Sequence, residues 1–310
     1  MNAPFSLTIG TRGSPLALAQ AEEVRDRLGA AWPALAGAID IEIIHTTGDQ
    51  VQDRPLALIG GKGLFTKEID EAQLAGRVDI AVHSMKDVPT LLPDGLLLAA
   101  LLPREDVRDV LLAPRARSLA ELPAGAVVGT ASLRRAAQIL RRRPDLTVVS
   151  LRGNVQTRLR KLAEGQVDAT LLAMAGLKRL GLTPPGATPL SIEEMLPAVA
   201  QGAIGITCRA NDMRMIELLT PLDDLSTRRR VATERAFLAV LDGSCRTPIA
   251  GLAEIVGDRL SFTGMILRPD GSQSHDVEAD GRPDQGESIG IGAGTSLLVR
   301  AGSGFLADLP

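Results

Sequence analysis

Residues 75–79 read Ala-Gly-Arg-Val-Asp, and this stretch ends a helical pattern at a glycine before opening a β-type run that reaches His83. Residues 164–168, Glu-Gly-Gln-Val-Asp, repeat the junction ahead of a second apolar run over 167–174. Outward from both junctions, short β-type runs alternate with helical patterns to about residue 220, which is typical of α/β architecture with mostly parallel strands. The repeated junction predicts two similar α/β domains with a cleft between them.

Polar residues mark where the helices are expected to begin. Ser14, Ser132 and Asn154 stand directly before helical apolar patterns, where their side chains can accept a hydrogen bond from the first turn. Residues 191–194, Ser-Ile-Glu-Glu, fit a capping box, which is the signature of a further helix start. The predicted strands cover residues 7–10, 39–45, 78–83, 126–129, 146–151, 167–174 and 203–208.

After Pro221 the pattern changes. A helix is expected over about 224–243, and alternating runs over 249–256 and 260–267 predict a hairpin through a Gly-Asp turn. Glycine-rich, acidic sequence over about 280–294 is expected to be flexible. This last part of the chain is predicted to be a small α+β domain.

Composition limits the function classes. The chain has 310 residues and a formal net charge of −3, so it is a poor general binder of nucleic acid. With 2% aromatic residues it offers few platforms on which single strands could stack. No signal peptide and no run of about 18 uncharged apolar residues is visible, and two cysteines suggest a reducing compartment or incidental thiols. We expect a cytoplasmic protein without nucleic-acid or membrane partners.

Three predicted strand-to-helix corners carry arginine together with a hydroxyl or amide side chain. In open α/β sheets, ligands bind outside the carboxyl ends of the strands, and helix N-termini there favour anions. The corners therefore predict a ligand with several carboxylates or phosphates, although pairing of each arginine with a surface acid is the alternative. Their residues are Arg12 and Ser14; Thr130, Ser132, Arg134 and Arg135; and Arg152, Asn154 and Arg158.

Other single residues suggest chemistry. Asp87 follows a predicted strand and suits a general acid or base, or the stabilisation of a developing cation, while Lys86 suits an anion; a capped loop is the alternative. Cys245 follows Gly243 and Ser244 in a glycine-containing loop, where a thiolate would be an accessible nucleophile, although a lone cysteine is usually inert. Cys208 is expected in the core. No His, Cys and carboxylate residues have metal-ligand spacing, so no metal is expected.

A series of motifs along residues 7–267 resembles the porphobilinogen deaminase (hydroxymethylbilane synthase) family. The most diagnostic is residues 81–89, Ala-Val-His-Ser-Met-Lys-Asp-Val-Pro. Residues 60–65, Gly-Gly-Lys-Gly-Leu-Phe, are similar to the active-site loop of the family. The other matching stretches are residues 11–17, 132–135, 151–155, 175–180, 201–203 and 244–245.

The resemblance implies an α/β fold of three domains. Two would be doubly wound domains similar to periplasmic binding proteins, with the chain crossing between them twice. The third would be a small α+β domain that carries the cysteine loop. The implied boundaries are 1–102 with 203–222 for the first domain, 103–202 for the second and 223–310 for the third.

The resemblance also implies a transferase of tetrapyrrole and haem biosynthesis. Cys245 would hold a dipyrromethane cofactor by a thioether, and four porphobilinogen molecules would be joined head to tail onto this primer before hydrolysis releases hydroxymethylbilane. Each porphobilinogen would lose ammonia to give an azafulvene cation, which the free α-carbon of the primer attacks. Asp87 would accept hydrogen bonds from pyrrole N–H groups and stabilise the cationic charge. The family leans towards monomers.

The resemblance further assigns the corners to the acetate and propionate groups of the pyrrole rings. The residues implied to hold the cofactor are Ser84, Lys86, Thr130, Ser132, Arg134 and Arg135. Those implied to hold incoming substrate or the growing chain are Arg12, Ser14, Arg152, Arg158 and Arg179.

Departures from the family pattern remove none of these groups. Ser244 stands where glycine often precedes the cofactor cysteine, and Leu58 where some members carry lysine. Ala131 replaces a common serine, and Ala200 a common glycine. Two alternatives stay open: a two-domain anion-binding protein without catalysis, and a different cysteine enzyme that turns over at Cys245.

Overall fold

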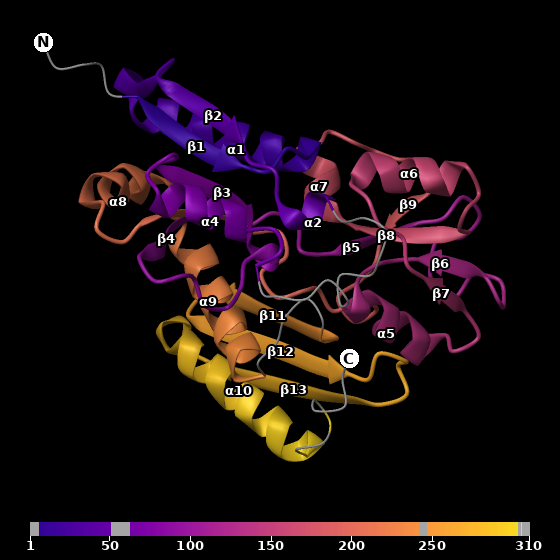
Figure 1. Ribbon diagram of the computed structural model, residues 1–310. Helices are drawn as coiled ribbons and strands as arrows, with labels where there is room; N and C mark the ends of the chain where they lie inside the picture. The colour runs from indigo at the N-terminus through magenta and orange to yellow at the C-terminus, as the bar shows by residue number, and fades with distance from the viewer. Residues whose placement is uncertain (1–5, 51–62, 242–246, 303–304, 306–310) are drawn as a thin grey trace, which may run out of the picture. The chain divides into compact units, whose positions relative to one another are not determined.

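The computed structural model describes residues 6–50, 63–241, 247–302 and 305 (Figure 1). The chain divides into two compact units. The first unit comprises Met1–Val51, Gly61–Glu105 and Ala203–Arg228, and the second comprises Gln52–Gly60, Asp106–Gly202 and Arg229–Pro310. The finer division into three domains stays a prediction.

The first unit contains a five-stranded mixed sheet in the order β2-β1-β3-β10-β4. β1 pairs in parallel with β2 and β3, whereas β10 lies antiparallel between β3 and β4. Helix α1 buries Ala21, Val24 and Leu28 in the core with these strands, at the spacing of one helical face. The strands are β1 (Leu7–Thr11), β2 (Ile39–Ile43), β3 (Ile80–Ser84), β4 (Leu96–Leu101) and β10 (Ile204–Arg209), and the helices are α1 (Pro15–Ala31), α2 (Thr47–Gln50), α4 (Lys67–Leu74) and α8 (Met213–Leu219).

The second unit contains a five-stranded sheet in the order β7-β6-β8-β5-β9. β6 pairs in parallel with β7 and β8, and β5 lies antiparallel between β8 and β9, so the pattern of directions is that of the first sheet. This confirms the predicted repetition of one α/β arrangement. The strands are β5 (Asp109–Leu112), β6 (Val127–Gly129), β7 (Thr147–Val149), β8 (Ala169–Ala173) and β9 (Ala187–Pro189), and the helices are α5 (Leu133–Arg142), α6 (Val155–Ala163) and α7 (Met174–Arg179).

The repeated Gly-X-Val-Asp junction has one conformation in both units. Gly76 and Gly165 both end a helix at positive φ, +73° and +72°, where glycine is favoured because it has no Cβ. The Asp79 carboxylate then accepts the Thr8 N–H at 2.8 Å, and the Asp168 carboxylate accepts the Val127 N–H at 2.7 Å. Each aspartate thus ties the start of one strand to its parallel neighbour, β3 to β1 in the first unit and β8 to β6 in the second.

The predicted helix caps are also confirmed. The side chains of Ser14, Ser132 and Asn154 accept the N–H three residues further on, at 3.2, 3.4 and 2.9 Å. The expectation of a helix start at residues 191–194 was wrong. The Ser191 hydroxyl accepts the Glu194 N–H at 3.2 Å, but the segment is a turn, because Pro197 follows within one helical turn.

The second unit also holds a three-stranded antiparallel sheet, β11-β12-β13, alongside which α10 runs in Figure 1. The predicted hairpin is confirmed, but the expected flexible stretch over 280–294 was wrong, because most of it belongs to α10. A Cβ at Gly290 would overlap the Thr233 carbonyl oxygen, so close packing on α9 compensates for the low helix propensity of glycine. The elements are α9 (Leu225–Val240), β11 (Ile249–Val256), β12 (Arg259–Leu267), β13 (Ser274–Gly281) and α10 (Gly286–Ala301).

Together the two mixed sheets with their helices and the small antiparallel sheet confirm the predicted fold class, α/β with an added α+β part. The expectation of mostly parallel strands was wrong, because β10 and β5 each run antiparallel to both of their neighbours. None of the helices within the described residues combines the length and the apolar character needed to traverse a bilayer.

Candidate functional site

The first unit gathers five of the predicted site residues around one cavity. The carboxyl ends of β1 and β3 point to the same edge of the sheet because these strands are parallel. Arg12 and Ser14 follow β1, while Ser84 ends β3 and the short 3-10 helix η2 (Met85–Asp87) supplies Lys86 and Asp87. All five line the cavity, together with Gln20, Phe65 and His83.

Arg12 lies between an aromatic ring and a carboxylate. Its guanidinium carbon is 4.2 Å from the centre of the Phe65 ring, and Nη1 is 3.8 Å from Asp87 Oδ2. The side chains of Arg12 and Asp87 are 22% and 29% exposed, so a ligand in the cavity can reach both. A carboxylate held in this way can accept N–H groups and stabilise positive charge.

The hydroxyl of Ser84 is held by the buried side-chain amide of Gln20. Gln20, on α1, donates from Nε2 to the Ser84 hydroxyl at 2.9 Å, and the hydroxyl lies 3.1 Å from Gln20 Oε1, which can accept its proton. Gln20 is buried while Ser84 is partly exposed, so the contact sets the direction in which the hydroxyl faces the cavity.

His83 lines the same cavity as a neutral group. Burial, with a smaller contribution from the positive charge of Arg12, lowers the pKa of His83 to about 4. Its Nε2 lies 3.4 Å from the hydroxyl of Thr207, which donates to Gln73 Oε1 at 2.9 Å. The positive charge lining the cavity therefore belongs to Arg12 and Lys86.

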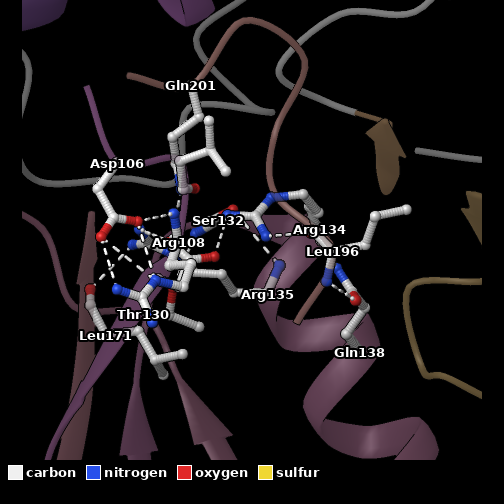
Figure 2. Close-up of polar contacts among 12 residues, drawn as sticks. Asp106, Arg108, Thr130, Ser132, Arg134, Arg135, Gln138, Leu171, Leu196 and Gln201 are labelled. Atoms are coloured by element: carbon white, nitrogen blue, oxygen red, sulfur yellow. Dashed lines mark hydrogen bonds and ion pairs between the residues drawn. The ribbon is translucent and has the colours of Figure 1, made fainter. Parts of the chain in front are cut away.

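The second unit gathers four predicted residues at one corner, Thr130, Ser132, Arg134 and Arg135, which Figure 2 labels; all but Ser132 are buried. Arg134 and Arg135 lie in the first turn of α5, each only 5% exposed, and both pair with the fully buried carboxylate of Asp109. Arg135 donates to Asp109 Oδ1 from Nε at 3.1 Å and from Nη2 at 2.6 Å, and from Nη1 to the Leu171 carbonyl at 2.9 Å.

Arg134 approaches the other carboxylate oxygen. Its Nη2 lies 2.8 Å from Asp109 Oδ2, and its Nη1 donates to the Leu196 carbonyl at 2.7 Å. Burial opposes ionisation of Asp109, but the two guanidinium groups outweigh it and hold the pKa of the carboxyl well below its usual range. Burial also lowers the pKa of Arg134, and the positive charge of Arg135 adds to this shift.

Hydroxyl groups complete this corner. Thr130, directly after β6, accepts the Ser132 N–H at 3.1 Å, and Ser132 in turn caps α5. Both hydroxyls thus stand at the N-terminus of a helix whose first turn carries two guanidinium groups. Such a corner favours an anion.

The remaining predicted arginines are partly buried: Arg152 lies between β7 and α6, Arg158 in the second turn of α6 and Arg179 at the end of α7. Arg158, on α6, donates from Nε to the Gly153 carbonyl at 2.9 Å, and the carbonyl of Arg152 accepts Lys161 Nζ at 3.1 Å. Arg179, on α7, donates from Nη2 to the Gly202 carbonyl at 3.0 Å. Each keeps a side chain partly exposed to solvent.

The chain has two cysteines, Cys208 and Cys245. Cys245, the predicted attachment residue, lies outside the described residues. Cys208 is fully buried on β10, as predicted, and burial raises the pKa of its thiol to about 11, so it is not a nucleophile at neutral pH. Within the described part of the chain, no group of three His, Cys, Asp or Glu side chains is placed to hold a metal ion.

Sequence reasoning missed three residues that shape these corners: Asp109, Gln20 and His83. Asp109 had no sequence signal, whereas His83 lies in the motif over residues 81–89. Gln20 and Gln138 each follow a helix-capping serine by six residues, as part of the repeat. Gln138 also fixes its corner, since it exchanges hydrogen bonds with the backbone of Leu196 at 3.0 and 2.9 Å (Figure 2).

Comparison with known proteins shows the family of this chain. The family model described as "Porphobilinogen deaminase, dipyromethane cofactor binding domain" matches residues 7–217, and "Porphobilinogen deaminase, C-terminal domain" matches residues 228–299. The chloroplastic porphobilinogen deaminase of Oryza sativa subsp. japonica is 59% identical over 98% of this chain and 86% of the relative. That of Nitrobacter hamburgensis is 56% identical over 96% of this chain and 94% of the relative.

Among solved structures, a periplasmic substrate-binding protein of an ABC transporter from Coxiella burnetii is 17% identical, with a TM-score of 0.43, over 70% of this chain and 91% of its own. A likeness at that level adds no conclusion. The two family models and the relatives together show that the chain belongs to the porphobilinogen deaminase family.

Proposed function

We propose that this enzyme joins four porphobilinogen molecules head to tail onto a dipyrromethane primer attached through a thioether to Cys245, and then releases hydroxymethylbilane. Family membership supports a role in tetrapyrrole synthesis and removes the alternative of an anion-binding protein without catalysis. The observation that carries the proposal is the Asp87 carboxylate, held by Arg12 in a cavity that Ser84 and Lys86 also line.

The donors of both corners fit a dipyrromethane. Each pyrrole ring carries an acetate and a propionate, and the corners offer guanidinium, ammonium and hydroxyl donors next to helix N-termini. When bound, the dipyrromethane supplies the nucleophilic carbon onto which pyrrole units are added. We assign its binding to Ser84, Lys86, Thr130, Ser132, Arg134 and Arg135.

Asp87 acts as an electrostatic stabiliser. Its carboxylate accepts pyrrole N–H groups and stabilises the positive charge that develops on porphobilinogen as ammonia leaves. Arg12 orients this carboxylate and also offers a guanidinium to a substrate carboxylate. We assign incoming substrate and the growing chain to Arg12, Ser14, Arg152, Arg158 and Arg179.

Asp87→Ala tests the proposal, with Asp94→Ala as the control because Asp94 is an exposed aspartate of the same unit outside the cavity. We expect Asp87→Ala to lose nearly all turnover of porphobilinogen while its intact mass still includes the primer. Asp94→Ala is expected to keep both. Normal turnover in Asp87→Ala would refute the assigned role.

The cytoplasmic location, the monomeric state and the lack of nucleic-acid and membrane partners stay predictions. Light scattering on the purified chain, with and without porphobilinogen, tests the monomeric state. One chain per particle is expected, and a larger particle would show an oligomer.

A further inference from the structure

The buried cluster of the second unit is unbalanced in charge. Two guanidinium groups face one carboxylate, so Arg134, Arg135 and Asp109 together carry one net positive charge where almost no solvent reaches. Taking a net charge out of water is unfavourable unless a counter-charge compensates for it. Nε of Arg134 is buried and has no hydrogen-bond acceptor among the described residues. Both observations indicate that an anion completes the cluster.

Asp109 is the fixed point of this cluster. Its backbone belongs to β5, which pairs with β8 on one side and β9 on the other. Gln201 donates from one nitrogen to Asp109 Oδ1 at 3.0 Å and to the Val107 carbonyl at 2.8 Å. The carboxylate therefore holds both guanidinium groups from a strand paired on both sides, while the carbonyls of Leu196 and Leu171 each accept one further hydrogen bond, from Arg134 and Arg135 respectively.

The fold itself does not require an acid at this position. In the register of the first sheet, Ile204 of β10 faces Ser84 at the end of β3; in the second, Asp109 of β5 faces Ala173 at the end of β8. Ile204 and Asp109 thus hold equivalent places in sheets of one topology, and both are fully buried. An apolar residue fills that place in the first unit, so the buried carboxylate of the second has a purpose other than forming the sheet.

We propose that Asp109 is a positioning residue: it aligns Arg134 and Arg135 and reduces their joint charge to one, so that the corner accepts a single carboxylate of the primer. It acts through the arginines and does not touch the ligand itself. This inference rests on the proposed function, since the carboxylate is that of the dipyrromethane.

The test measures primer assembly on the apo-protein. Wild type, Asp109→Asn and Glu234→Gln are each incubated with porphobilinogen, and the gain in intact mass is followed in time per folded molecule. Glu234 is the matched control, because its carboxylate is also fully buried in the second unit but accepts the N–H groups of Ala200 and Ala253. We expect Asp109→Asn to assemble the primer at least about tenfold more slowly than wild type, because misaligned groups lose binding geometry, and Glu234→Gln to match wild type. Assembly by Asp109→Asn at the wild-type rate would overturn the proposal.

A double variant separates alignment from folding. Asp109→Asn combined with Arg135→Gln restores a net charge of one, so we expect it to fold at least as well as Asp109→Asn and still assemble slowly. Because Asp109 and Arg135 act through one contact, the double variant is expected to assemble the primer about as slowly as the slower of Asp109→Asn and Arg135→Gln alone. Losses that multiply would overturn the proposal, and so would a failure of both Asp109 variants to fold. If the wild type itself gains no mass, it is the proposed function that fails.

Discussion

The two α/β units share a strand order, a pattern of directions and a glycine–aspartate junction, yet their polar corners differ. The first presents a partly exposed Arg12–Asp87 pair beside a neutral buried histidine. The second buries Arg134 and Arg135 around Asp109. The same arrangement of strands thus supports an open corner suited to chemistry and a closed one suited to holding an anion. The chemistry comes from a few residues at strand ends and not from topology.

The largest expected difference concerns stability. Asp109→Asn leaves two buried guanidinium groups without a counter-charge and is expected to lower the free energy of unfolding by about 3–5 kcal/mol. Asp87→Asn breaks a partly exposed pair, so we expect a loss of about 1 kcal/mol or less. Urea denaturation of both apo-proteins measures these values. Equal losses would show that the two corners do not differ in burial as described.

Between pH 7 and 4, His83 of the first unit is expected to make the fold sensitive to acid. The folded-state pKa of His83 is lowered to about 4, so between its ordinary value and pH 4 the unfolded chain binds a proton that the folded chain does not. The contribution of His83 is therefore fully present above about pH 6.5 and is lost as the pH falls, by up to about 3 kcal/mol. His83→Gln should lose less stability than wild type between pH 7 and 4. Parallel pH profiles of the melting temperature for the two proteins would contradict this.

The repeated junction allows a matched comparison of two aspartates. Asp79→Ala and Asp168→Ala each remove a carboxylate that accepts a strand N–H, a loss of about 1 kcal/mol. Asp79 also lies 3.4 Å from Arg209 Nη2, so its removal is expected to cost about 0.5 kcal/mol more. Thermal unfolding of both variants gives the order, and a larger loss at Asp168 would reverse it.

The smallest effect is expected at Ala200, which has a positive φ of 60°. A residue with a Cβ in the left-handed region is strained by about 1–2 kcal/mol. Glycine removes this strain, but the greater conformational freedom of glycine in the unfolded chain offsets part of the gain. Ala200→Gly should therefore raise the free energy of unfolding by about 0.5–1 kcal/mol. Ala253→Gly is a suitable contrast, since it lies in a strand and should be destabilising. A destabilising Ala200→Gly would show that the methyl contact outweighs the strain.

Local sequence signals predicted much of this fold. Capping residues, glycine stops and alternating runs gave the first helix, the repeated junction and the hairpin of the last sheet, because these features depend on neighbouring residues. β4 was not predicted, because its Leu-Leu-Leu-Ala-Ala-Leu sequence lacks alternation, and the glycine-rich sequence of α10 was wrongly expected to be flexible. Gly286, Gly290 and Gly294 of α10 are explained by their packing against α9, which no local pattern contains, and nothing in the structure explains Gly292.

The candidate site also combines residues with a local sequence signal and residues that only distant contacts define. Arg12, Ser84, Lys86 and Asp87 lie in two short motifs, so the sequence could indicate them and the structure brings them to one cavity. Asp109 lies in a run of charged residues without distinction, and its partners are on a helix 25 residues further along the chain. A residue defined by distant partners has no local signal, which is why only the structure reveals it.

The central claim is that the chain builds a pyrrole polymer on a primer bound to Cys245. It is tested most directly by the intact mass of the protein after brief exposure to limiting porphobilinogen, beside Cys245→Ser treated in the same way. The account predicts a primer of two deaminated porphobilinogen units in the wild type, with further single-unit steps up to four, and an unmodified mass in the variant. A wild-type protein that keeps its bare-chain mass, or the same series of steps in Cys245→Ser, would contradict it.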